Sequence, residues 1–85
     1  RSTLFPYTTL FRSQRMALFM YELPDHAIKG SLRSVDKVDV NIIANCFGGG
    51  GHVRAAGFTA GIPYEEVVKK VITELKKQVE KCITE

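Results

Sequence analysis

The chain has 85 residues, enough for one small domain, and 45% of them are apolar, which excludes a disordered polypeptide. Its 12 lysines and arginines exceed its 9 acidic residues by a net charge of +3, and no stretch reads as a membrane span. Cys46 and Cys82 form no CxxC pair, so we expect reduced thiols in a cytoplasmic protein.

The first segment, RSTLFPYTTLFRS, follows neither the helix nor the strand period and does not begin with Met. It resembles a translated sequencing adapter, and it lacks the unbroken apolar core of a signal peptide. We therefore expect residues 1–13 to be non-native or disordered and residues 14–85 to form the domain, with a native extended arm as the alternative. Leaving out Arg1 and Arg12 lowers the net charge from +3 to +1. Recognition of phosphate would then depend on local contacts and not on a positive electrostatic potential over the whole surface.

A β-hairpin is predicted next. MALFMYE (16–22) and IKGSLRS (28–34) carry enough β-branched, aromatic and aliphatic residues for paired strands, and the LPDHA between them contains a Pro-Asp turn. The Asp25–His26 pair within it is interpreted as part of a surface turn and not as a metal site.

A short helix is predicted before the glycines. Val40, Ile43, Ala44 and Phe47 recur at the spacing of one helix face, and Asp39 is placed to cap the first turn. After the glycines, HVRAA (52–56) is predicted to form about one helical turn before a short strand over FTAG, so the glycine loop would join two helical pieces.

The run GGGGH, Gly48 to His52, is the strongest functional signal in the chain. Four glycines together are costly in backbone entropy, so we expect something to approach this backbone closely. Bare amides beside the start of a helix favour an anion such as phosphate. The alternative is that Gly48 ends the preceding helix in a left-handed conformation and that the other glycines only join elements.

A long amphipathic helix is predicted at the C-terminus, beginning near Pro63, with lysines and glutamates on its solvated side. Its apolar stripe consists of Val68, Val71, Ile72, Leu75, Val79, Cys82 and Ile83. Together the elements predict an α+β fold with a small sheet of three or four strands.

In this order, SLRS (31–34), VDVNIIANCFGGGGHVRAAG (38–57) and the terminal helix resemble the C-terminal DHH-associated domain of the DHH-family phosphoesterases, most closely the branch with nanoRNase and pAp phosphatase activities. The resemblance covers roughly residues 16–80. It implies that an N-terminal DHH domain holds a pair of divalent metals, usually manganese, while the associated domain binds the nucleotide. This chain would then be the second lobe only, without a metal site and inactive alone.

The resemblance also implies roles for individual residues. Arg33 would hold a substrate phosphate, for which its planar, permanently charged fork is suited, and Ser34 would add a hydrogen bond. Gly49, Gly50 and Gly51 would let backbone amides approach the substrate, and His52 would contact the phosphate near the reaction centre. The alternatives are a solvated charge for Arg33 and a capping histidine without a ligand for His52.

The motif ends at Ala55, Ala56 and Gly57, whose small side chains would allow close packing beside the bound nucleotide; ordinary packing is the alternative. Arg54 occupies a variable position of the motif. The expected partners are the missing DHH domain and short oligoribonucleotides or adenosine 3′,5′-bisphosphate. The competing hypotheses are a non-enzymatic nucleotide- or nucleic-acid-binding module, the equivalent lobe of a RecJ-type single-strand exonuclease, and the related domain of alanyl-tRNA synthetases and their editing factors.

Overall fold

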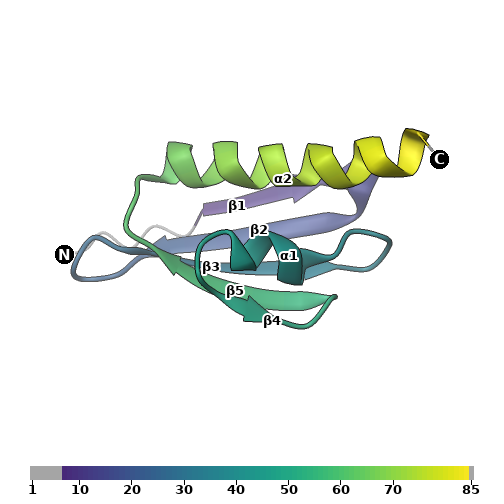
Figure 1. Ribbon diagram of the computed structural model, residues 1–85. Helices are drawn as coiled ribbons and strands as arrows, with labels where there is room; N and C mark the ends of the chain where they lie inside the picture. Colours follow the sequence, from purple (N-terminus) through teal and green to yellow (C-terminus); the bar gives the residue numbers. More distant parts are fainter. Residues whose placement is uncertain (1–6, 85) are drawn as a thin grey trace.

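The computed structural model describes residues 7–84 and the side chains of residues 8–79. Five strands form one antiparallel sheet with the order β1-β2-β3-β5-β4, so the α+β prediction is confirmed, with more strands than expected. The elements are β1 (Tyr7–Phe11), the 3-10 turn η1 (Arg12–Gln14), β2 (Met16–Glu22), β3 (Ile28–Ser34), α1 (Val40–Asn45), β4 (Gly50–Gly51), β5 (Ala55–Ala60) and α2 (Tyr64–Thr84) (Figure 1).

The core lies on one face of the sheet, beneath both helices (Figure 1). Alternate residues of β2 and β3 are buried, as the period of two in a strand requires when one face is covered. The helices contribute Val40, Ile43 and Ala44 from α1 and Val67, Val71 and Leu75 from α2. On the other face of the sheet, which we call the open face, no helix packs within the described residues.

The predicted hairpin is confirmed. Strands β2 and β3 pair from Met16↔Ser34 to Glu22↔Ile28. In the turn, the Ala27 N–H donates to the Asp25 carboxylate at 3.1 Å, and His26 lies 2.6 Å from Glu22. Asp25 and His26 are both exposed, as a surface turn requires.

The edge strand β1 falls within the segment that the sequence led us to set aside. Tyr7 to Phe11 pair with Met20 to Met16 of β2, and Phe11 packs against the core. Of residues 1–13, Tyr7–Phe11 therefore form a strand and Arg12 and Ser13 belong to η1, while residues 1–6 lie outside the described residues. Whether the segment is native stays a prediction. Five residues on an edge strand show too few alternations for the period to be recognised in the sequence.

The helical turn predicted over HVRAA is wrong. His52 and Ala55 exchange backbone hydrogen bonds of 2.7 and 3.2 Å, so Val53 and Arg54 form a two-residue hairpin turn between β4 and β5. A single helical turn gains one hydrogen bond for the ordering of three residues, whereas Ala55–Ala60 gain a full ladder with β3.

Helix α2 has its predicted amphipathic character, with Val71 and Leu75 buried and Val68, Ile72 and Val79 half-buried. Val67, which is not in the predicted stripe, is fully buried. Cys82 and Ile83 lie outside the residues whose side chains are described. Within residues 7–84, no helix combines the length and the apolarity needed to cross a membrane.

Candidate functional site

The first glycine of the loop ends helix α1. Gly48 has φ +81, its N–H donates to the Asn45 carbonyl at 3.0 Å, and the Gly49 N–H donates to the Ala44 carbonyl at 3.0 Å. This pair of bonds is a Schellman motif, which needs a left-handed residue at the position of Gly48. The alternative reading of Gly48 is therefore confirmed.

Two further glycines make room for strand β5. A Cβ on Gly49 would meet the Gly57 carbonyl oxygen and lie 2.8 Å from the Phe58 Cα. A Cβ on Gly51, which has φ +157, would lie 2.7 Å from the Ala56 Cα. The close approach expected from the sequence is thus real, but the approaching group is the neighbouring strand of the same chain.

The backbone amides of the loop are already used within the chain. Besides Gly48 and Gly49, the Gly51 N–H donates to Asn41 Oδ1 at 2.9 Å and the His52 N–H donates to the Ala55 carbonyl. Because hydrogen-bonded pairs alternate along an antiparallel ladder, Gly50 and Gly57 form the next such pair. Within residues 7–84, no helix begins beside the loop either. The expected cradle of bare amides at a helix start is therefore wrong.

Strand pairing places Arg33 and His52 in one row on the open face. Arg33 lies opposite Ala17 of β2 and Ala55 of β5, and Ala55 in turn lies opposite His52. Residues directly opposite one another share a face of the sheet. Two strand spacings put the Arg33 and His52 backbones about 10 Å apart. Both side chains are exposed, and neither makes a hydrogen bond or ion pair with another described residue.

Ser34 does not share this face. Its side chain is buried, at 5% exposure, and its hydroxyl accepts a hydrogen bond from the Asp36 N–H at 3.3 Å. Consecutive residues of a strand point to opposite faces, so Ser34 lies beneath the sheet when Arg33 lies above it. Ala56 lies on the covered face too, packed against the core, whereas Ala55 and Gly57 are on the open face. The structure thus brings together only part of the predicted residue set.

Two aromatic residues on the open face were missed from the sequence. Phe19 and Tyr21 of β2 are 43% and 44% exposed, and Phe19 lies opposite Ser31, one row from Arg33. The signal was present, since the buried positions of MALFMYE are Met16, Leu18 and Met20 and the rings stand at the alternate positions.

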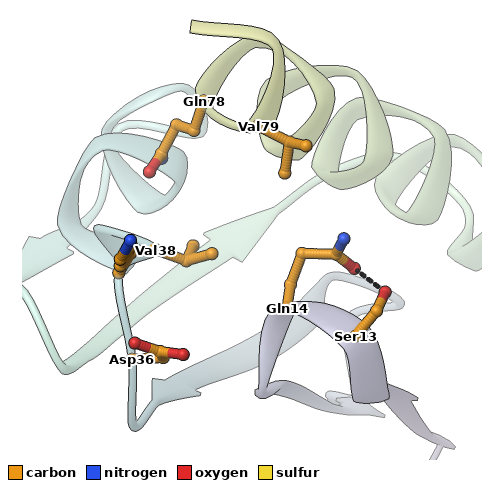
Figure 2. A pocket seen from close by; sticks show the side chains of 7 residues that line it. Ser13, Gln14, Asp36, Val38, Gln78 and Val79 are labelled. Atoms are coloured by element: carbon orange, nitrogen blue, oxygen red, sulfur yellow. Dashed lines mark hydrogen bonds between the residues drawn. The ribbon is translucent and has the colours of Figure 1, made fainter. Parts of the chain in front are cut away.

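A separate pocket of about 210 Å³ opens between the β1–β2 turn, the loop that follows β3 and the C-terminal part of α2 (Figure 2). Gln78, on its wall, exchanges two hydrogen bonds of 2.9 Å with the backbone of Asp39. None of the predicted site residues lines this pocket, which includes Ser13, Gln14 and Asp36. Among the described residues, no group of three His, Cys, Asp or Glu side chains could hold a metal ion.

Comparison with known proteins assigns most of the chain to one family. The family model described as the DHHA1 domain matches residues 10–83, from within β1 to the last turn of α2. No curated protein matches the chain.

Proposed function

The chain belongs to the DHHA1 domain family, the accessory domain of DHH-family phosphoesterases, and from that premise we propose that it is the substrate-binding lobe of a metal-dependent phosphoesterase. The proposed substrates are short oligoribonucleotides, adenosine 3′,5′-bisphosphate or both. The observation that carries the proposal is an arginine without a partner on an uncovered sheet face.

Arg33 is placed to bind a phosphate. Its guanidinium is exposed and has no carboxylate partner among the described residues. Its cross-strand neighbours Ala17 and Ala55 and the nearby Gly57 have small side chains, which leave room for a ligand above the sheet. A guanidinium offers paired donors to phosphate oxygens, and such charge-assisted bonds are about twice as strong as neutral ones.

His52 supplies a second polar group for the same ligand. It ends the row that contains Arg33, and its ring is exposed. A phosphate between the two would accept from the guanidinium on one side and from an imidazole N–H on the other. Such donors stabilise negative charge as it builds on a phosphate in the course of hydrolysis.

The exposed rings of β2 favour a nucleotide over a bare phosphate. Phe19 is diagonal to Arg33 across the β2–β3 pair, a backbone separation of about 7 to 8 Å. Unpaired bases of single-stranded nucleic acids stack on exposed aromatic side chains. Phe19 and Tyr21 would therefore hold a base while Arg33 holds its phosphate.

The described residues do not offer a metal site. We propose that a DHH domain, which precedes this lobe in the complete enzyme, binds the divalent metals, which are expected to be manganese. The residues of this chain bind and orient the phosphate, and no catalytic step is assigned to them alone.

The proposal can be tested by calorimetric titration of two ligands into the 85-residue chain. The ligands are 5′-phosphorylated diadenylate and adenosine 3′,5′-bisphosphate. Arg33→Ala removes the proposed hydrogen bonds to the ligand phosphate and should weaken binding about 10- to 100-fold. His52→Ala should weaken it less, and Arg33→Lys should restore only part of the loss because the fork is missing. Lys69→Ala removes an exposed charge from α2 and serves as the control. Equal affinities of the parent, Arg33→Ala and His52→Ala would refute the proposed site.

A further inference from the structure

Two arginines near Arg33, Arg12 and Arg15, were not among the predicted site residues. A shallow pocket of about 220 Å³ opens where the β1–β2 turn meets the end of β3. Arg12, Arg15 and Arg33 line it, together with apolar side chains that include Leu10 and Val35. We call it the arginine pocket.

The arginine pocket carries positive charge without compensation. No Asp or Glu is among its lining residues, and none of its three arginines forms an ion pair within the described part of the chain. Like charges gathered at one site repel one another, and an anion that binds between them removes the repulsion and adds charge-assisted hydrogen bonds. The pocket therefore has the electrostatics of an anion site.

Arg15 occupies a backbone conformation that arginine seldom adopts. It closes η1 with φ 57 and ψ 47, in the left-handed region where glycine and asparagine are the usual residues. Backbone hydrogen bonds hold it there: its N–H donates to the Arg12 carbonyl at 3.1 Å, and its carbonyl accepts from the Val35 N–H at 3.2 Å. Residues held in this strained region cluster at active sites and ligand clamps, which agrees with a role for Arg15 in binding.

Arg15 lies near Arg33, the proposed ligand of the first substrate phosphate. Its hydrogen bond with Val35 extends the β2–β3 pairing by one step beyond Met16↔Ser34, which puts Arg15 diagonal to Arg33. The diagonal separation in a sheet is about 7 to 8 Å between backbones. Two flexible guanidiniums at that spacing can each hold a different phosphate of one oligonucleotide.

We propose that the arginine pocket binds a second phosphate of the substrate, with Arg15 as its ligand. This inference rests on the proposed function, because it takes Arg33 as the site of the first phosphate. The substrate strand then runs over the open face toward the β1–β2 turn, and the lobe distinguishes ligands by the number of their phosphates.

The test compares ligands with one, two and three phosphates: AMP, 5′-phosphorylated diadenylate and 5′-phosphorylated triadenylate, each titrated into the 85-residue chain. Arg15→Gln should weaken the two oligonucleotides about tenfold and leave AMP unchanged. It should also lower the salt dependence of triadenylate binding by about 0.7 in the log–log slope, the share of one phosphate on a single strand. Lys69→Gln, which removes one positive charge from α2, should change none of these values.

A second variant separates binding from folding. Arg15→Gly suits the left-handed backbone, so it should melt no lower than the parent chain while losing the same affinity for triadenylate. If Arg15→Gln and Arg15→Gly bind triadenylate as the parent does while Arg33→Ala does not, the second phosphate site is wrong and the proposed function stands. Equal weakening of AMP and triadenylate by Arg15→Gln would also overturn it, since Arg15 would then hold the first phosphate. If Arg33→Ala has no effect either, the proposed function fails with it.

Discussion

The side-chain oxygen of Asn41 accepts a hydrogen bond of 2.9 Å from the backbone N–H of Gly51, which ties the first turn of α1 to strand β4. Strand β4 consists of Gly50 and Gly51 alone and has no side chains with which to pack. This bond therefore acts together with the pairing to β5 in positioning the strand that leads into His52.

Replacement of Asn41 should loosen this connection. Asn41→Ala removes the acceptor and is expected to lower the free energy of unfolding by about 1 kcal/mol. The Gly51 amide should exchange its hydrogen faster than in the parent. Urea unfolding and amide exchange by NMR measure the two effects. Asn45→Ala, on the same helix but without a side-chain hydrogen bond among those described, is the matched control. Identical amide protection in both variants would show that the bond does not hold β4.

Gly30 is expected to tolerate no side chain. A Cβ on this residue would clash with the far end of the Phe58 ring, which lies directly opposite on β5 and stacks on Phe47 at 4.3 Å. Gly30→Ala should lower the free energy of unfolding by about 1 to 3 kcal/mol, because the packed ring must move. Urea unfolding checks this value.

Two further variants test whether the ring is the cause. Gly61→Ala meets no atom within 4 Å and should leave stability unchanged or slightly raised. The double variant Gly30→Ala with Phe58→Leu should be more stable than the sum of its single changes predicts, since the shorter side chain frees the space. Additive losses would argue against a clash with Phe58.

Phe19 should contribute to nucleotide binding by stacking. Phe19→Leu keeps an apolar side chain on the open face but removes the ring, and it should weaken binding of diadenylate about tenfold. Calorimetric titration measures the change. Ile42→Ala, which shortens a 48% exposed apolar residue on α1, should bind as the parent does. Equal affinity of Phe19→Leu and the parent would leave the rings without a role in recognition.

Cys46 should react slowly with alkylating reagents at neutral pH. Desolvation by burial and, next, the nearby Glu74 carboxylate raise the pKa of its thiol above the usual value of 9.0. Both effects penalise the thiolate in the folded chain, so stability falls as the pH rises above the thiol's unfolded pKa and through its folded pKa. In a Cys82→Ala background, Glu74→Gln should shift the pH profile of iodoacetamide labelling at Cys46 to lower pH. Glu65→Gln, at the start of α2, should not. An unchanged profile for Glu74→Gln would contradict the assigned cause.

Local patterns in the sequence were sufficient for the hairpin, α1 and α2. Asp39 caps α1 by accepting from the Asn41 and Ile42 amides, and the stripe of α2 meets the core, because capping and periodicity depend on residues within one or two turns. The same reasoning failed for HVRAA, whose structure is decided by pairing with β3, about twenty residues earlier. The glycines were correctly interpreted as a site of close approach, but the sequence alone could not identify β5 as the group that approaches.

For the candidate site, too, the sequence predicted one part and the tertiary structure decided the other. Arg33 and His52 became candidates through the resemblance of the sequence to a family motif, which needs no distances. Only the tertiary structure put them in one row, buried Ser34 beneath the sheet and satisfied the glycine amides within the chain. It also brought Arg15 to Arg33 and left Phe19 uncovered. The physical reason is that sequence spacing sets which way a side chain points within its own strand, whereas its neighbours on other strands are selected by pairing and by the burial of one face of the sheet.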